Sequence, residues 1–457
     1  MESSNANGLT VIIVGAGLAG VMLALLLEKQ GVNYFILERA QAVKPLGSVM
    51  SINSNILPVF EQLGLFEDVK KISKPCRSIG LHDLQMNKIV DINMADYEQM
   101  TGYQPAVFAR PRLYELMVSR VPAHKIFRGK KVVSIEETVD HVVVKCSDDS
   151  QYQGDIVVGA DGAYSGVRQS LFKKLEGEGQ LPKSDTQDLT YGWVCTVGLT
   201  KAMDPEKYPF LKDDVSRFSQ VIGKDLLNYT AVTVTDNQMC WSLVVQQEKE
   251  NAVKDPNLRN AEWAAPEALE TSLKEFYAFP CPLGGMMKDL IDATPKESIS
   301  KVFLEEKMFE TWHHGRVVLI GDGAINAMQD AVILSNCLYD LRSTKLSEIT
   351  AAFKDYREQR YPHAQSQFDN SRLVGRLTCG QGFSDKILRY FVFNILPASI
   401  QRQQFLKAAS YRPQACFLPL AENRGQGPVM PQKPSWRREL ELHQERQHSN
   451  EQQPVAA

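Results

Sequence analysis

The sequence lacks the residue patterns of several specialised protein classes. Its eight cysteines stand singly with no Cys-x-x-Cys pair, so we expect neither a zinc site nor a disulfide framework, and a reducing compartment is indicated. Positive charge is not in excess either: the net charge of -3 argues against a nucleic-acid partner. The eight histidines follow no metal-ligand spacing, so no metal ion is predicted.

Long apolar runs are also missing. No uninterrupted apolar stretch reaches about 18 residues, and the first residues, MESSNANGL, carry no basic region followed by an apolar core. We therefore expect neither a spanning helix nor a signal peptide, and a cytoplasmic location. The most membrane-like segment, 387–400, contains Arg389 and Pro397, so peripheral attachment to a membrane through it is the less favoured alternative.

Residues 10–39 carry the pattern around which the chain is organised. The run Val11–Val14 predicts a buried parallel strand, and residues 18–30 have helical periodicity. Three glycines follow the strand in G-x-G-x-x-G spacing: Gly15 and Gly17 lie before the predicted helix, and Gly20 lies in its first turn. This spacing suits a tight turn, close approach of the backbone to a pyrophosphate, and packing of helix on strand, with the first helical amides, at Leu18 and Ala19, facing the phosphates.

Glu38 supports a dinucleotide site. It ends the next predicted strand, roughly 20 residues past the glycines, where a carboxylate would accept the hydroxyls of an adenosine ribose. An acid at this position disfavours a 2′-phosphate, so the tightly held nucleotide should be FAD or NAD rather than NADP. The alternative is a βαβ unit whose glycines serve packing only.

Three segments resemble the single-component FAD-dependent monooxygenases of the aromatic-hydroxylase type, with fungal members nearest. The first is the glycine turn with Glu38 and Arg39, the second is GADGAYSGVR at 159–168, and the third is Gly321-Asp322 with Gly323 and a helix that contains Asp330. The resemblance covers roughly residues 10–375. It implies an α/β fold: a Rossmann-like FAD-binding domain with a parallel sheet, an antiparallel substrate domain and a helical C-terminal region.

The resemblance also implies domain limits and site residues. The FAD-binding domain would comprise 1–75, 105–182 and 301–375, the substrate domain 76–104 and 183–300, and a helical segment 376–423 would follow. The polar composition of residues 424–457 predicts a disordered tail. By the same resemblance, the residues that bind FAD are Gly15, Gly17, Leu18, Ala19, Gly20, Glu38, Arg39, Ser51, Arg110, Asp161, Gly162, Asp322 and Gly323, with Arg168 tying the site together. For Asp161 and Asp322, capping of the following helix is the alternative.

The implied activity is hydroxylation or epoxidation of an aromatic or terpenoid-like small molecule. NAD(P)H would be the transient reductant of FAD, and O2 would react through a C4a-hydroperoxyflavin. Candidate lining residues of the substrate pocket are Tyr191, Trp193, Phe218, Tyr229 and Trp241, with core packing as the alternative for each. No catalytic side chain and no oligomeric state is assigned.

The third segment departs from the family pattern. The sequence passes from Gly321-Asp322 directly to GAINAMQDA, about ten residues shorter than the family's loop, and we expect a connection below the usual two to six residues. Either the helix would unwind over Gly323–Gln329 or Asp322 would be displaced. Two alternatives therefore stay open: a catalytically impaired or silent FAD-binding variant, and a flavin dehydrogenase or reductase that transfers no oxygen.

Overall fold

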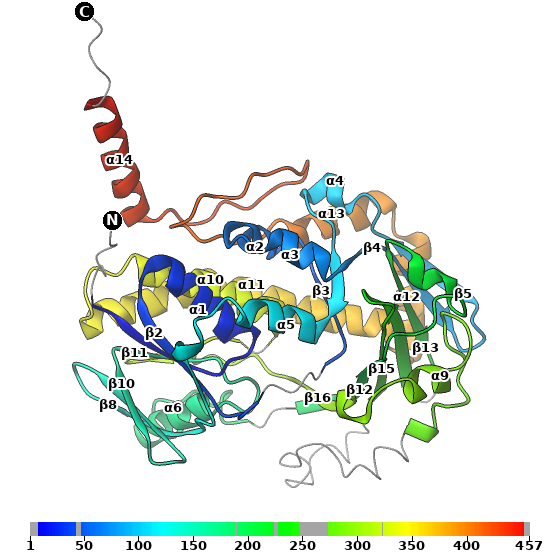
Figure 1. Ribbon diagram of the computed structural model, residues 1–457, viewed down its shortest axis with the longest axis horizontal. Helices are drawn as coiled ribbons and strands as arrows, with labels where there is room; N and C mark the ends of the chain where they lie inside the picture. Colours follow the sequence, from blue (N-terminus) through cyan, green and yellow to red (C-terminus); the bar gives the residue numbers. More distant parts are fainter. Residues whose placement is uncertain are drawn as a thin grey trace, which may run out of the picture.

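The computed structural model describes residues 8–42, 47–187, 190–223, 227–246, 273–321 and 323–451. One of its two large sheets has six strands in the order β17-β18-β11-β1-β2-β7 (Figure 1). The strands are β1 (Thr10–Val14), β2 (Asn33–Glu38), β7 (Ile126–Arg128), β11 (Ile156–Gly159), β17 (His313–His314) and β18 (Val317–Leu319). All neighbouring pairs are parallel except β17 with β18, as the buried run in β1 predicts.

Layers cover both faces of this sheet. Alternate residues of β1 point to opposite sides: Val11 and Ile13 pack with the helices of one layer, whereas Ile12 and Val14 pack with the other. The first layer contains α1 (Leu18–Gln30), α5 (Arg110–Val118), α10 (Ala324–Tyr339) and α11 (Leu346–Thr378). The second contains β8 (Val132–Glu137), β9 (Val142–Cys146), β10 (Gln151–Gly154) and α6 (Gly166–Gly177).

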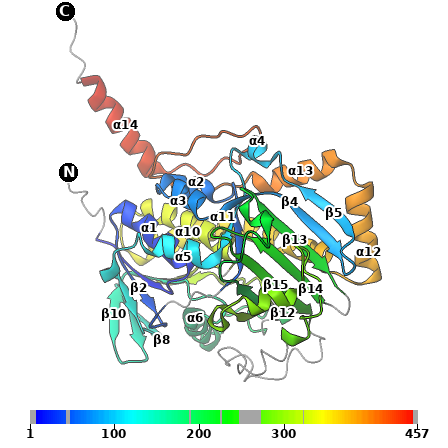
Figure 2. The same ribbon diagram turned by 45° about the vertical axis from the view of Figure 1, so that its right-hand side comes forward.

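The second large sheet has nine strands in the order β16-β12-β15-β14-β13-β4-β6-β3, with β5 paired to β4 (Figure 2). Its strands are β3 (Val49–Ile52), β4 (Lys74–Asp83), β5 (Lys88–Asn93), β6 (Ala106–Ala109), β12 (Thr190–Leu199), β13 (Ser216–Ile222), β14 (Leu227–Thr233), β15 (Met239–Gln246) and β16 (Ser300–Glu306). Pairing is antiparallel except between β13 and β4. The predicted α/β class is confirmed.

Shorter elements and the C-terminal helices complete the chain. They are α2 (Leu57–Gln62), α3 (Phe66–Lys71), α4 (Tyr97–Thr101), η1 (Ala123–Lys125), η2 (Pro209–Lys212), α9 (Met287–Asp292), η3 (Lys296–Ser298), α12 (Phe383–Tyr390), the π-helix η4 (Phe391–Ile395), α13 (Ala398–Ala409) and α14 (Trp436–Glu451). None of the helices in the described ranges is both long and apolar enough to cross a bilayer.

The prediction of a disordered tail from residue 424 is wrong for the described part of that segment. Figure 1 shows α14 projecting from the body of the molecule. Its start is fixed at the end of α10, where the Ser435 hydroxyl donates to Asp340 (2.6 Å) and accepts the Arg438 amide (3.1 Å). Lys433 also pairs with Asp355 at 2.8 Å. These contacts form with distant residues, so the polar composition of the tail could not indicate them.

Candidate functional site

The glycine turn joins β1 to α1 in the predicted way. Gly15 has φ +104°, and a Cβ built there would lie 2.5 Å from the Ala160 carbonyl oxygen. A Cβ on Gly20 would overlap the carbonyl oxygen of Gly15 itself. Both positions therefore require glycine, and Gly15 brings the first motif into contact with Ala160 and Asp161 of the second.

Gly17 plays a different part, because it leaves space. A Cβ built on Gly17 would meet no atom of the described residues within 4 Å. Gly17 is the N-cap of α1, no side chain caps this end, and no acidic residue stands in the first turn. The first-turn amides, including those of Leu18 and Ala19, have no acceptor within the helix, so this end favours an anion. The open cradle fits the pyrophosphate of a dinucleotide.

The Glu38 carboxylate is held beside this turn. One oxygen accepts the Ala16 amide and the other accepts the Ala40 amide, each at 2.8 Å. A carboxylate offers about four lone-pair positions, so two remain for ribose hydroxyls. Arg39, by contrast, lies exposed at the end of β2, and no contact of its side chain joins it to the turn in the described residues.

Two residues that the sequence analysis missed join this cluster. Arg128 lies directly opposite Glu38 in the β2–β7 register, and its buried Nη1 has no hydrogen-bond partner among the described residues. Burial raises the pKa of Tyr114; the charge of Glu38 raises this pKa further, whereas the charges of Arg128 and Arg110 lower it. A guanidinium nitrogen without a partner, beside a carboxylate that is placed to bind ribose hydroxyls, suits a phosphate oxygen or another hydrogen-bond acceptor of an adenosine nucleotide.

Arg110 stands where β6 of the nine-stranded sheet leads into α5, which packs on the six-stranded sheet. It begins α5, and its amide donates to the Ser48 carbonyl at 2.9 Å. Its side chain covers Gly47, where a Cβ would stand 3.2 Å from Arg110 Cδ. Ser51 follows on β3, half-buried and paired with Val107. The two predicted residues therefore both lie beside β6, Ser51 paired with it and Arg110 directly after it.

In the second motif, the Asp161 carboxylate caps α6. It accepts the Gly166 amide at 2.7 Å, the Val167 amide at 3.3 Å and the Ser165 hydroxyl. This geometry favours the capping alternative, while contact of Asp161 with FAD stays a prediction. Gly162 has φ +79° and faces open space. The Arg168 guanidinium donates to the Ala163 carbonyl and lies 4.5 Å over the Phe309 ring, so Arg168 holds this turn.

In the third motif, the expectation of an abnormally short connection is wrong. β18 ends at Leu319 and α10 begins at Ala324, so four residues link them, which is within the usual range. The helix does not unwind: it begins directly after its N-cap, Gly323. Asp322 lies outside the described residues, and its displacement stays a prediction.

A buried ion pair anchors this connection. Asp330, in the second turn of α10, accepts the Gly321 amide at 2.9 Å with one oxygen and the Arg360 Nε at 2.6 Å with the other. The side chains of Asp330 and Arg360 are 2% and 0% exposed. The end of β18 is therefore tied to α10 and α11 through one carboxylate.

The candidate pocket residues divide between the two faces of the nine-stranded sheet. Tyr229 and Trp241 are fully buried and pack with α9. The Tyr229 hydroxyl donates to the Pro280 carbonyl, and the Trp241 indole donates to the Thr294 hydroxyl. For these two residues the structure supports core packing. Phe218 packs on the opposite face with Leu199, near β6, and the alternation along β12 places Trp193 on that face too. The side chain of Tyr191 lies outside the described residues.

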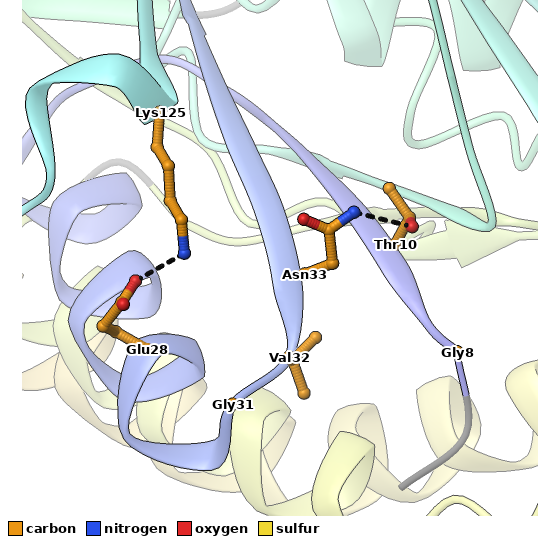
Figure 3. A pocket seen from close by; sticks show the side chains of 7 residues that line it. All are labelled: Gly8, Thr10, Glu28, Gly31, Val32, Asn33 and Lys125. Carbon is orange, nitrogen blue, oxygen red and sulfur yellow. Dashed lines mark hydrogen bonds and ion pairs between the residues drawn. The ribbon is translucent and has the colours of Figure 1, made fainter. Parts of the chain in front are cut away.

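A surface cavity of about 570 Å³ is unrelated to this site. It opens at the start of β1 and β2, whereas the glycine turn follows the end of β1 (Figure 3). Its lining residues are Gly8, Thr10, Glu28, Gly31, Val32, Asn33 and Lys125, with Glu28 and Lys125 ion-paired at 2.7 Å. Metal ligands are not indicated either, since no cluster of three suitable side chains occurs among the described residues.

Comparisons with known proteins agree with this geometry. The family model described as "FAD binding domain" matches residues 8–261. The FAD-dependent monooxygenase ptmM of Penicillium ochrochloron is 28% identical over 85% of this chain and 93% of its own length. The FAD-dependent monooxygenase paxM of Penicillium paxilli is 29% identical over 83% of this chain and 81% of its own.

The fold also matches a solved structure. HpxO of Klebsiella pneumoniae, complexed with FAD and uric acid, superposes with a TM-score of 0.71 at 20% identity, over 90% of this chain and all of that one. At this identity the likeness concerns the fold. The comparisons give no support to the alternative of a catalytically impaired FAD-binding variant.

Proposed function

The chain belongs to the FAD-binding monooxygenases of the aromatic-hydroxylase type, and we propose that it is an NAD(P)H-driven enzyme that oxygenates an aromatic or terpenoid-like small molecule. One atom of O2 enters the substrate, by hydroxylation or epoxidation, and the other leaves as water. NAD(P)H and a proton supply the two electrons and the two hydrogens. The observation that carries the proposal is the open cradle at Gly17, beside the uncapped start of α1 and the Glu38 carboxylate.

In this proposal the dinucleotide end of the cofactor is held by backbone and charge. The amides at the start of α1 bind the pyrophosphate, Glu38 accepts the ribose hydroxyls, and the free Nη1 of Arg128 donates to the adenosine diphosphate. Bound FAD supplies the hydride acceptor and the activation of O2. Asp322 is proposed to contact the ribityl chain, with Gly323 beside it.

The chain's own contribution at the substrate is to orient it and exclude water. Phe218 and Trp193 share one face of the nine-stranded sheet, where Phe218 packs with Val107 and Ala109 of β6. Arg110 follows Ala109 in the chain, and Ser51 pairs with Val107. An apolar wall there would shield the reacting centre. We propose the division into FAD-binding domain, substrate domain and helical segment given above, without the disordered tail, and NAD(P)H would reach the FAD site transiently.

The test compares two glycines that differ in what surrounds them. Gly17→Ala places a methyl group in the cradle without straining the backbone (φ −71°), so the protein should fold while its FAD affinity falls at least about tenfold, through lost amide–phosphate hydrogen bonds. Gly177→Ala, on α6 with equally open surroundings, is the matched control and should bind FAD as the wild type does. Flavin per chain, from the absorption spectrum, is the first readout.

Product analysis with isotopically labelled O2 is the second readout. Label in the product, with NAD(P)H consumed in equal amount, would support the proposal. A folded wild-type chain that cannot be loaded with FAD would refute it. Oxidation of NAD(P)H by the flavin-loaded chain, without label in any product, would favour the dehydrogenase or reductase alternative.

A further inference from the structure

Exposed apolar side chains gather in one part of the molecule. Between residues 373 and 400 eight large apolar side chains are exposed: Leu373, Val374, Phe383, Ile387, Tyr390, Phe391, Ile395 and Ile400. Phe383 is 81% exposed, the largest exposure among the large apolar residues described. Single exposed apolar residues are ordinary on a protein surface, but a contiguous group marks an interaction site.

Five of these side chains lie on one helical face. Phe383, Ile387, Tyr390, Phe391 and Ile395 recur at intervals of three and four residues along α12 and the π-helix η4, which follow each other without a break. We call them the α12–η4 face. At about 1.5 Å per residue, the face is about 20 Å long. Figure 2 shows α12 at the outer edge of the molecule, far from the six-stranded sheet.

The α12–η4 face is exposed on a helix that is held firmly against the rest of the protein, and its exposure does not come from fraying of the helix. Arg389, which is 8% exposed, donates from Nε to the Leu377 carbonyl at 2.7 Å and from Nη2 to the Gly380 carbonyl, and so clasps α12 against the end of α11. The end of α11 is in turn bound to the nine-stranded sheet, where Asn228 donates to the Cys379 carbonyl at 3.2 Å. The opposite side of α12 is thereby fixed to the protein body, and the apolar side faces outward.

Basic residues exceed acidic ones in the segment that carries this face, with Arg389 and Arg412 buried and Arg376 paired with Asp385. Residues 370–412 contain seven lysines and arginines against a single acid, Asp385, a net charge of +6 in a chain whose total is -3. Lys386, Arg402 and Lys407 are exposed. An apolar helical face flanked by basic and aromatic side chains is the pattern of helices that lie in the headgroup region of a membrane. Two copies meeting through this face would bring two positive regions together, which disfavours self-association.

We propose that the α12–η4 face docks on a membrane surface that carries anionic lipid headgroups. The five apolar side chains would enter the boundary between headgroups and acyl chains, and the exposed lysines would lie at the level of the phosphates. The proposal goes beyond oxygenation and does not depend on it.

The test is a vesicle flotation assay with the full, flavin-loaded chain. Vesicles of phosphatidylcholine alone are compared with vesicles that contain about 30 mol% phosphatidylserine, at about 0.1 M and about 1 M salt. We expect binding to the anionic vesicles that high salt weakens. The Phe383→Ser/Phe391→Ser variant should partition at least about tenfold less, because two large apolar groups no longer enter the bilayer. Lys386→Ala and Lys407→Ala should each cost about fivefold at low salt.

Val139→Ser is the matched control. Val139 is 73% exposed in the hairpin between β8 and β9, so its replacement removes an equally exposed apolar group elsewhere and should leave vesicle binding unchanged. All variants should keep the wild-type circular dichroism spectrum and flavin content, and the lysine variants test the proposal independently if the phenylalanine variant misfolds. Absence of vesicle binding, equal binding to neutral vesicles without a salt effect, or a dimer that the phenylalanine variant abolishes would each overturn the proposal.

Discussion

Breaking the buried Asp330–Arg360 pair should cost far more stability than breaking an exposed ion pair. Both side chains are buried, at 2% and 0% exposure, and their charged atoms lie 2.6 Å apart. Asp330→Asn keeps the shape and an acceptor for the Gly321 amide but leaves Arg360 charged and buried, so we expect the free energy of unfolding to fall by about 3–5 kcal/mol. Arg360→Met should have a similar effect for the converse reason.

The double variant makes the argument sharper. With both charges gone, no buried ion is left uncompensated, so Asp330→Asn/Arg360→Met should be less destabilised than the sum of the two single variants by about 2–3 kcal/mol. Urea unfolding followed by tryptophan fluorescence, at fixed FAD, measures the three values. The control is Lys433→Met, which breaks the partly exposed pair with Asp355 and should cost less than about 1 kcal/mol. Strict additivity, or a cost of Asp330→Asn no larger than that of the control, would refute the reasoning.

Two further predictions concern cofactor binding and pH. Arg128→Met should weaken FAD binding about tenfold or more in titrations of the apoprotein, because FAD loses the hydrogen bond from Nη1 of Arg128; a change below about twofold would contradict that role. Burial, with Arg357 and His314 nearby, lowers the pKa of His313 from 6.5 to about 4, so below pH 6.5 the unfolded chain binds the extra proton first. Stability should therefore fall by about 2 kcal/mol as the pH drops from about 6.5 to about 4, allowing for partial exposure, and His313→Phe should flatten that dependence in urea titrations.

The first motif could be predicted from the sequence because its geometry is local. The roles of Gly15 and Gly20 follow from contacts within about ten residues and from the parallel strand beside them, and the structure contains those contacts. Arg128 and Tyr114 could not be found in the same way. Arg128 reaches Glu38 only because β7 pairs with β2, and Tyr114 comes near it from α5. The sequence spacing between these elements carries no signal of that arrangement.

The substrate sheet shows a different limit. Alternation along a strand predicts two faces, but it does not say which face meets the helix and which meets the cofactor domain. Trp241 and Phe218 look equivalent in sequence as large aromatics in strand-like runs. In the structure, Trp241 packs against α9 and its indole donates to Thr294, whereas Phe218 packs on the other face with residues of β6. Only the packing of α9 on the sheet separates a core residue from a candidate pocket residue.

The third motif explains why a shortened sequence need not mean a broken site. The sequence pattern suggests that the strand runs to Gly321, but it ends two residues earlier, at Leu319, which is the usual uncertainty of an element boundary. For this reason the connection looks too short in the sequence. With β18 ending at Leu319, four residues reach α10 without unwinding it. What holds this connection is the Asp330 carboxylate, which binds the Gly321 amide and Arg360 at once. A buried ion pair between α10 and α11 therefore anchors the start of α10, and a shorter loop can lead into this helix. Its first turn has no side-chain cap and keeps the positive end of the helix dipole.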